Sequence, residues 1–237
     1  MIPKIIHYCW FGQGTIPEEA LRCIDSWHKY MPDWEYLLWN EDNFDISSYP
    51  YAREAYEAKK YAFVSDVARL KALRDYGGIY FDVDFEVYKP FDDLLWNESF
   101  AGFEGSKHNP VMMGVLGSIP NGQWVTWQLE RYENRHFVEG GRLDLTTNVR
   151  FVTDAMVEQG FLPNGQEQRF MDLHVYPVDF FCPKQTSGEY RRTNNTYCEH
   201  KSSSSSWAEL SLMDRLFRYL PSGLKVFLIK SKRFIFG

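Results

Sequence analysis

Three carboxylates stand at alternate positions just after a glycine pair, in the stretch YGGIYFDVDFEVYKPF. They are Asp82, Asp84 and Glu86. Side chains of a strand alternate between its two faces, so this spacing predicts one acidic face and one apolar face. The apolar residues are Phe81, Val83, Phe85 and Val87. They predict burial in a sheet, whereas the acidic face needs a neutralising partner because like charges about 7 Å apart repel one another.

The spacing of Asp82 and Asp84 suits a hard divalent cation held between the protein and a diphosphate. Mg²⁺ or Mn²⁺ takes about one or two carboxylates, and phosphate oxygens and water complete its octahedron. A solvated face of an edge strand is the alternative. Phosphatases of the haloacid-dehalogenase type also place Asp-x-Asp after an apolar strand, but with Thr or Val at the fifth position. Here that position is Glu86, and the motif lies a third of the way along the chain, which disfavours such a phosphatase.

A helix expected from about Lys60 to Tyr76 precedes the acidic strand and ends at Gly77-Gly78. Asp66, Arg69 and Leu73 share one face of this helix. An exposed ion pair between Asp66 and Arg69 would contribute only about 0.3 kcal/mol. The alternative is that the helix brings both side chains beside the cation site, where a carboxylate and a guanidinium can bind sugar hydroxyls.

The remaining elements predict an α/β fold in one domain. KIIHYCWF and WEYLLW are expected strands, and a helix opened by Pro17 connects them, which makes a β-α-β unit. The apolar stripe of that helix is expected to contain Ala20, Leu21, Ile24, Trp27 and Met31. Strands are expected at SFAGFE, VMMGVLGS and LHVYPVDFFCP, and helices at NGQWVTWQLERYENRH and TTNVRFVTDAMVEQG.

Composition excludes several classes of protein. The 237 residues carry a net charge of -6, which argues against nucleic acid as the main partner. The four cysteines have no zinc spacing and indicate a reduced, intracellular environment. No basic leader precedes a long apolar run at the N-terminus, and no stretch approaches the roughly 18 apolar residues of a spanning helix.

The last thirty residues, 208–237, differ in character from residues 1–207. Leu, Phe and Ile alternate there with Lys and Arg, so the segment is basic and amphipathic. Such a segment can lie on an anionic membrane surface, or it can be a terminal helix docked on the domain. We therefore expect a catalytic domain over 1–207, a separate C-terminal segment over 208–237, and a cytoplasmic protein with peripheral contact to the membrane.

Four stretches in order resemble glycosyltransferase family 32, the capsular-polysaccharide family with a DXD sugar-binding region, and more distantly the clostridial glucosylating toxins. They are IPKIIHYCWFG, DWEYLLWNED, KYAFVSDVARLKALRDYGGIYFDVDFEVYKP and YCEHKSSSSSW. The resemblance covers roughly residues 1–207. It implies a fold of the GT-A type, in which a Rossmann-like mixed sheet with flanking helices binds the nucleotide sugar.

The resemblance also implies roles for residues of the donor site. Asp66 and Arg69 would hold the hydroxyls of the donor sugar, and Tyr80 would contact the ribose or the sugar. Trp10, with Phe11 beside it, would bind the nucleotide by stacking on the base.

The implied metal contacts come from both ends of this region. Asp84 would bind the metal directly and Asp82 would contact the ribose and the metal's water. Ser205 and Trp207 would close over the diphosphate. Many relatives read His-His-x-x-x-Ser-Trp where this chain has EHKSSSSSW, so His200 is either a third metal ligand or an ordinary surface histidine, with Ser205 as the other candidate ligand.

The expected activity is a retaining, metal-dependent transfer of a hexose from a nucleotide sugar to a glycan or lipid-linked acceptor, in surface or capsular polysaccharide synthesis. A UDP-hexose is the expected donor and GDP-mannose the second candidate, with Mn²⁺ or Mg²⁺ as cofactor. Glu86 and Asp92 lie near the site, but no motif makes either a catalytic base. The alternatives are a binding module that has lost catalysis and a phosphohydrolase of nucleotide sugars.

Overall fold

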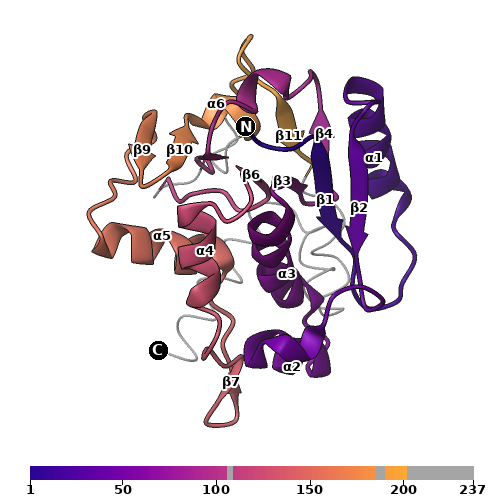
Figure 1. The fold of residues 1–237 in the computed structure, drawn as a ribbon, viewed down its shortest axis with the longest axis vertical. Helices are drawn as coiled ribbons and strands as arrows, with labels where there is room; N and C mark the ends of the chain where they lie inside the picture. The colour runs from indigo at the N-terminus through magenta and orange to yellow at the C-terminus, as the bar shows by residue number, and fades with distance from the viewer. Residues whose placement is uncertain (106–108, 185–189, 202–237) are drawn as a thin grey trace, which may run out of the picture. The chain divides into compact units, whose positions relative to one another are not determined.

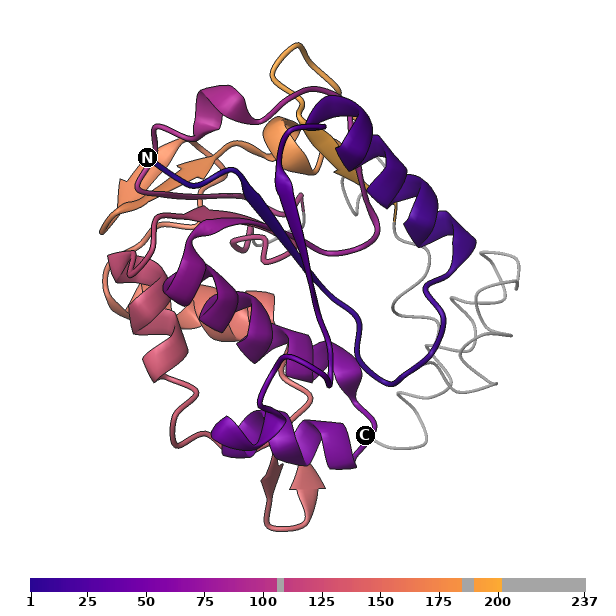
Figure 2. The same cartoon turned by 45° about the vertical axis from the view of Figure 1, so that its right-hand side comes forward.

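The computed structural model describes residues 1–105, 109–184 and 190–201. Within them, helices cover both faces of a seven-stranded sheet (Figures 1 and 2). The helices are α1 (Glu18–Tyr30), α2 (Pro50–Glu57), α3 (Tyr61–Tyr76), α4 (Gln123–Glu130), α5 (Asn148–Glu158) and α6 (Val178–Phe181), with 3-10 turns η1 (Ile46–Ser48) and η2 (Asp92–Leu94). The strands of the large sheet are β1 (Ile5–Cys9), β2 (Glu35–Trp39), β3 (Gly78–Phe81), β5 (Ser99–Gly102), β6 (Val115–Ser118), β9 (Gln168–Phe170) and β10 (Leu173–Tyr176). Two small sheets pair β4 (Phe85–Val87) with β11 (Cys198–His200), and β7 (Val138–Glu139) with β8 (Arg142–Leu143).

The large sheet is mixed and has the order β2-β1-β3-β6-β5-β10-β9. Strand β1 runs parallel to β2 and β3, β10 runs parallel to β5, and β6 is antiparallel to both β3 and β5. The carboxyl ends of β1, β2, β3, β5 and β10 therefore meet at one edge. In open α/β sheets ligands bind outside such an edge. The expected α/β fold, with a mixed sheet and flanking helices, is confirmed.

Two apolar clusters fill the space on the two faces of the sheet. Helices α1 and α6 pack on one face, where Trp27 stacks on Phe81 at 5.2 Å between ring centroids. Helices α2, α3, α4 and α5 pack on the other face, together with Tyr80. Neighbouring residues of β3 thus serve opposite faces, as the alternation of a strand requires.

The first β-α-β unit is confirmed, with β1 and β2 parallel over five residue pairs. The predicted apolar stripe of α1 is wrong at one position. Leu21 is 45% exposed, whereas Cys23 is 5% exposed and takes a place beside Ile24. Leu21 therefore lies outside the buried stripe, which runs through Ala20, Cys23, Ile24 and Trp27.

A buried histidine joins three of these elements. His7 on β1 accepts a hydrogen bond at Nδ1 from the indole of Trp39, with 3.1 Å between the nitrogens. Its Nε2 lies 2.7 Å from the carbonyl oxygen of Gly77, at the end of α3. The ring is therefore neutral with its proton on Nε2, and burial lowers the pKa of His7 to about 4 even though the bond to Gly77 opposes the shift.

Helix α3 is enclosed on nearly every side. It ends at Gly77, whose φ of 65° suits glycine and whose backbone N–H bonds to Leu73. Asp66 and Arg69 are 6% and 4% exposed, so the alternative of an exposed ion pair on this helix is wrong.

None of the helices in the described part of the chain reaches the length and apolarity of a membrane span. The predicted boundary between 207 and 208, and the basic segment beyond it, lie outside the described residues.

Candidate active site

The predicted donor-binding residues gather at the carboxyl edge of the large sheet. Trp10 follows β1 directly, and Asp82 follows β3 directly. Met113 lies just before the antiparallel strand β6, so it reaches the same edge from the opposite direction. Three segments that are far apart in the sequence therefore meet at one place.

The acidic stretch is a turn between two strands, which corrects the expectation of one continuous strand. Strand β3 ends at Phe81, and the backbone N–H of Asp82 bonds to the carbonyl oxygen of Gly114 at 2.8 Å. The chain then turns, with the N–H of Phe85 on the carbonyl oxygen of Asp82 at 3.2 Å, and β4 begins in a different sheet. The carboxylates consequently have different neighbours, and Glu86 pairs with Lys201 at 2.6 Å.

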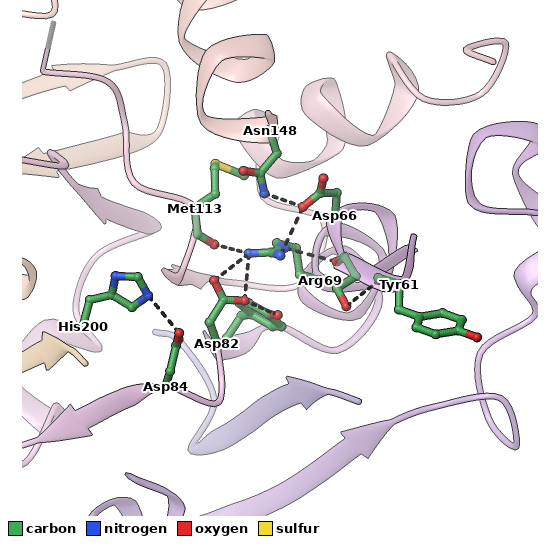
Figure 3. Close-up of polar contacts among 10 residues, drawn as sticks. Tyr61, Asp66, Arg69, Asp82, Asp84, Met113, Asn148 and His200 are labelled. Atoms are coloured by element: carbon green, nitrogen blue, oxygen red, sulfur yellow. Dashed lines mark hydrogen bonds and ion pairs between the residues drawn. The ribbon is translucent and has the colours of Figure 1, made fainter. Parts of the chain in front are cut away.

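Arg69 is the centre of the polar contacts at this edge (Figure 3). Its Nη2 lies 3.1 Å from Oδ1 of Asp66, and its Nη1 lies 3.2 Å from Oδ1 of Asp82. Nη1 also donates to the carbonyl oxygen of Met113 at 2.6 Å. The guanidinium thus fixes two carboxylates from two elements, and its flat fork suits that arrangement.

Tyr80 lies against this cluster from the strand below. The guanidinium carbon of Arg69 is 4.6 Å from the centre of its ring, and its hydroxyl donates to Oδ1 of Asp82 at 2.7 Å. Burial raises the pKa of Tyr80 well above its usual range, although Arg69 opposes the shift. Tyr80 therefore remains protonated and serves as a donor that orients Asp82.

Burial also changes the acidity of the cluster's charged groups. It raises the pKa of Asp66 to about 7, with Arg69 opposing the rise and the nearby charge of Asp82 adding to it. For Arg69 burial disfavours the charged form, but Asp82, Tyr80 and Asp66 outweigh burial and raise its pKa. Arg69 therefore stays charged, and Asp66 accepts a proton more readily than an ordinary aspartate.

Sequence reasoning missed Asn148, the first residue of α5. Its Nδ2 donates to Oδ1 of Asp66 at 2.5 Å, and that oxygen also accepts from Arg69. The available signal was weak: Asn148 ends a polar run, Thr146-Thr147-Asn148, at the start of a predicted helix. No local pattern links that run to Asp66, 82 residues earlier.

A second group of contacts joins Asp84 to the end of the described chain. Strand β11 pairs with β4 so that His200 lies opposite Phe85, and their rings stack with centroids 4.8 Å apart. Nε2 of His200 then lies 3.0 Å from Oδ2 of Asp84. Burial lowers the pKa of His200, but the bond to Asp84 outweighs burial, so the pKa is raised. His200 therefore has a specific acidic neighbour, Asp84.

Asp84 and His200 fit a divalent cation that the substrate helps to bind. Within 1–105, 109–184 and 190–201, no three or more His, Cys, Asp or Glu side chains are arranged to hold a metal by themselves. Mg²⁺ or Mn²⁺ bound with phosphates needs only one or two carboxylates from the protein, and an imidazole is a ligand for divalent transition metals. One carboxylate and one imidazole in contact are such a pair.

The predicted nucleotide contacts differ in their exposure, and two of them lie outside the described residues. Trp10 is partly exposed, and its indole donates to the carbonyl oxygen of Gly14 at 2.7 Å, which shapes the loop after β1. Phe11 is 6% exposed and packs edge-on against Phe44, so it belongs to the core. Ser205 and Trp207 lie outside the described residues.

The comparisons with known proteins agree with this site. Residues 17–101 match the family model of the glycosyltransferase sugar-binding region containing DXD motif. Inositol phosphoceramide mannosyltransferase 3 of Schizosaccharomyces pombe is 32% identical over 136 residues, which are 50% of this chain and 37% of that protein. A mannosyl phosphorylinositol ceramide synthase of Saccharomyces cerevisiae is 30% identical over 58% of this chain and 38% of its own length.

Among solved structures, the PaToxG glycosyltransferase matches with a TM-score of 0.48 and 20% identity, over 67% of this chain and 69% of that one. The chain spans less than two fifths of the two mannosylating relatives. The match over residues 17–101 contains Asp66, Arg69, Asp82 and Asp84. The part of the chain that holds these residues therefore matches the glycosyltransferase sugar-binding region containing a DXD motif, and the resemblance to glycosyltransferase family 32 is confirmed.

Proposed function

We propose that this protein is a metal-dependent, retaining glycosyltransferase that moves a hexose from a nucleotide sugar to a lipid or glycan acceptor. One observation carries the proposal. Arg69 joins Asp66 to Asp82 in a buried cluster, and the Asp84–His200 pair stands next to it at the carboxyl edge of the sheet. Sugar-binding and cation-binding groups are thus adjacent, as a sugar attached to a diphosphate requires.

Each group has a distinct task in this proposal. Asp66 and Arg69 hold hydroxyls of the donor sugar, while Tyr80 keeps Asp82 oriented toward the ribose and the water of the metal. Asp84 and His200 would hold a divalent cation, which would supply positive charge to the diphosphate leaving group. Trp10 stacks on the base at the end of β1.

The transfer needs no nucleophile from the protein. The acceptor hydroxyl forms its bond to the anomeric carbon on the face from which the diphosphate departs, and its proton passes to an oxygen of that diphosphate. Glu86 is paired with Lys201, and Asp92 with Lys4, at 2.6 Å in both cases. Neither carboxylate receives a catalytic role, and trapping a covalent glycosyl-enzyme would overturn this route.

The donor and acceptor follow in part from the relatives. Both are named for mannosylation of an inositol-containing ceramide. A mannosyl donor such as GDP-mannose is therefore to be tested beside the UDP-hexose that the sequence predicts. A lipid acceptor would suit a protein that works at the cytoplasmic membrane face. Sedimentation of the full chain with anionic vesicles, compared with a chain ending at Trp207, tests that location, and equal sedimentation would remove the C-terminal segment from it.

The deciding experiment measures nucleotide release from a panel of UDP- and GDP-sugars with Mn²⁺. Wild type is compared with Asp84→Asn and with Asp92→Asn as a matched control. Asp92 lies on η2, and its carboxylate pairs with Lys4. We expect release from one or two donors, abolished by EDTA and by Asp84→Asn but unchanged in Asp92→Asn.

Two other results would favour the alternatives. Equal release from every donor would identify a phosphohydrolase. Metal-dependent donor binding without release, even with lipid and glycan acceptors added, would identify a binding module.

A further inference from the structure

A second arginine lies behind the sugar-binding cluster and is tied to the start of α5. Arg135 follows α4, and its side chain is only 12% exposed. Its Nη2 lies 2.6 Å from Oδ2 of Asp144. Its other terminal nitrogen, Nη1, is buried without a hydrogen-bond acceptor among the described residues. A buried cation with a single carboxylate partner needs another source of stabilisation.

Aromatic rings supply that stabilisation. The guanidinium carbon of Arg135 lies 3.6 Å from the ring centre of Phe151 and 4.5 Å from that of Tyr51. A third ring, that of Tyr132, lies at 5.2 Å. A guanidinium over aromatic faces is attracted by their negative charge, more strongly where water is excluded. The flat guanidinium can thus contact rings and a carboxylate at once, which an ammonium group cannot do as well.

These contacts hold the first turn of α5 from both sides. Asp144 precedes the helix, and its Oδ1 accepts from the backbone N–H of Thr146 at 3.0 Å. Phe151 lies one turn into the helix, and its N–H bonds to the carbonyl oxygen of Thr147 at 2.9 Å. Arg135 therefore contacts Asp144, which precedes α5, and Phe151, which lies at the end of the first turn of α5.

Asn148 lies between those two contacts and reaches the donor site. Its Nδ2 is 2.5 Å from Oδ1 of Asp66, the oxygen that Arg69 also contacts at 3.1 Å. A shift of the first turn of α5 would move this amide away from Asp66. Asp66 would then keep one hydrogen-bond donor fewer in a buried place, and its position relative to Arg69 would change.

We propose that Arg135 is a positioning residue for sugar recognition, which acts by holding Asn148 on Asp66. The inference rests on the proposed function, because it assigns Asp66 to the donor sugar. It predicts that loss of Arg135 weakens recognition of the sugar and leaves recognition of the nucleotide intact. Asp84 pairs with His200, whereas Arg135 pairs with Asp144, so the groups that would serve the diphosphate have another partner.

The test compares the affinities of Arg135→Gln for a nucleotide sugar and for the matching nucleoside diphosphate, with Mn²⁺ present. We expect Arg135→Gln to bind the nucleotide sugar about tenfold more weakly than wild type, because tenfold is the effect of one lost buried contact. Its affinity for the nucleoside diphosphate should stay within about twofold of wild type. Arg150→Gln is the matched control. Arg150 lies on the first turn of α5, the turn that Arg135 contacts, but is 75% exposed and pairs with Asp154, so both affinities should stay at the wild-type values.

A general structural defect would weaken both ligands equally, and that result, or no change in either, would overturn the inference. In an Asn148→Ala background, Arg135→Gln should add less than twofold, because the residue through which it acts is gone. A full tenfold loss there would also overturn it.

The same pair of variants gives a readout that needs no ligand. Urea unfolding gives the factor by which each variant changes the unfolding equilibrium constant. The factor for the double variant should differ at least threefold from the product of the factors for the two single variants. If wild type binds no nucleotide sugar, the proposed function fails, and this coupling still decides whether Arg135 positions Asn148. Additive effects would overturn the inference.

Discussion

Replacement of Arg69 by lysine should destabilise the protein strongly, although charge is conserved. Arg69 donates from Nε to the carbonyl oxygen of Ser65 at 3.1 Å, in addition to its contacts with Asp66, Asp82 and Met113. A lysine carries one nitrogen at the end of a flexible chain, so it cannot reach all four partners.

The magnitude follows from what is left unpaired. The side chains of Asp66 and Arg69 are 8% and 5% exposed, so solvent does not replace lost contacts. A hydrogen bond to a charged group is worth about 1.5–3 kcal/mol, and breaking a buried ion pair costs about 3–5 kcal/mol. We expect Arg69→Lys to lower the free energy of unfolding by about 4 kcal/mol.

Urea unfolding measures this loss directly. With an m-value of about 2 kcal/mol/M, the midpoint should fall by about 2 M at unchanged slope. Arg74→Lys is the control, because Arg74 lies on the same helix, is 28% exposed and pairs with Asp75; its midpoint should fall by less than about 0.5 M. Equal shifts in the two variants would refute the assignment of Arg69 as the centre of a buried cluster.

Three further predictions concern the frame of the site. Protonation of His7 should account for about 3 kcal/mol of lost stability between pH 6.5 and pH 4, because burial lowers its pKa to about 4 and favours its neutral form; in urea unfolding at these two pH values, His7→Gln should therefore lose less stability on acidification than wild type. Gly12→Ala should cost about 1–3 kcal/mol and weaken nucleotide binding, because Gly12 has φ of 97° and a Cβ there would lie 2.4 Å from Tyr61, so an unchanged thermal midpoint would contradict the close approach. Glu86→Gln should cost less than about 1 kcal/mol, because the side chains of Glu86 and Lys201 are both more than a third exposed; a shift above 2 kcal/mol in urea would show that this pair does more than brace β4.

The sequence predicted structure correctly where a short local motif marks the end of a helix or a strand. Gly77-Gly78 marks the end of α3, and the Asp-x-Asp that follows marks the carboxyl end of β3. Because both signals are local, the helix, the strand and the adjacency of Arg69 to Asp82 could be predicted. The alternation of apolar and acidic residues was misleading in the same stretch. Phe81, Val83 and Phe85 are buried as the alternation predicts, but Asp84 is 4% exposed and is buried with them, because the chain turns there and the strand ends.

Contacts that span long stretches of sequence could not be predicted in the same way. Strand β11 reaches β4 across 111 residues, and this pairing alone sets His200 beside Asp84. The carbonyl oxygen of Met113 accepts a hydrogen bond from Arg69. Every residue has a backbone carbonyl, so the residue type at position 113 gives no sign of this contact. Such groups are selected by the way elements pack, so no spacing within one element identifies them.

Electrostatics explains why the site draws its parts from so many elements. Two carboxylates, Asp66 and Asp82, share the single guanidinium of Arg69, so the buried cluster carries one negative charge in excess when both are ionised. Burial raises the pKa of Asp66, and the charge of Asp82 adds to that rise. A neutral amide is the partner that can hold Asp66 without changing the charge, and Asn148 is that amide. A second cation in its place would pair with Asp66 and compete with Arg69, which would release Arg69 from the bridge to Asp82. The neutral contact from α5 therefore keeps the bridge intact, and Arg135, which holds α5 in place, pairs directly with Asp144 while its charge also favours the ionised form of Asp66.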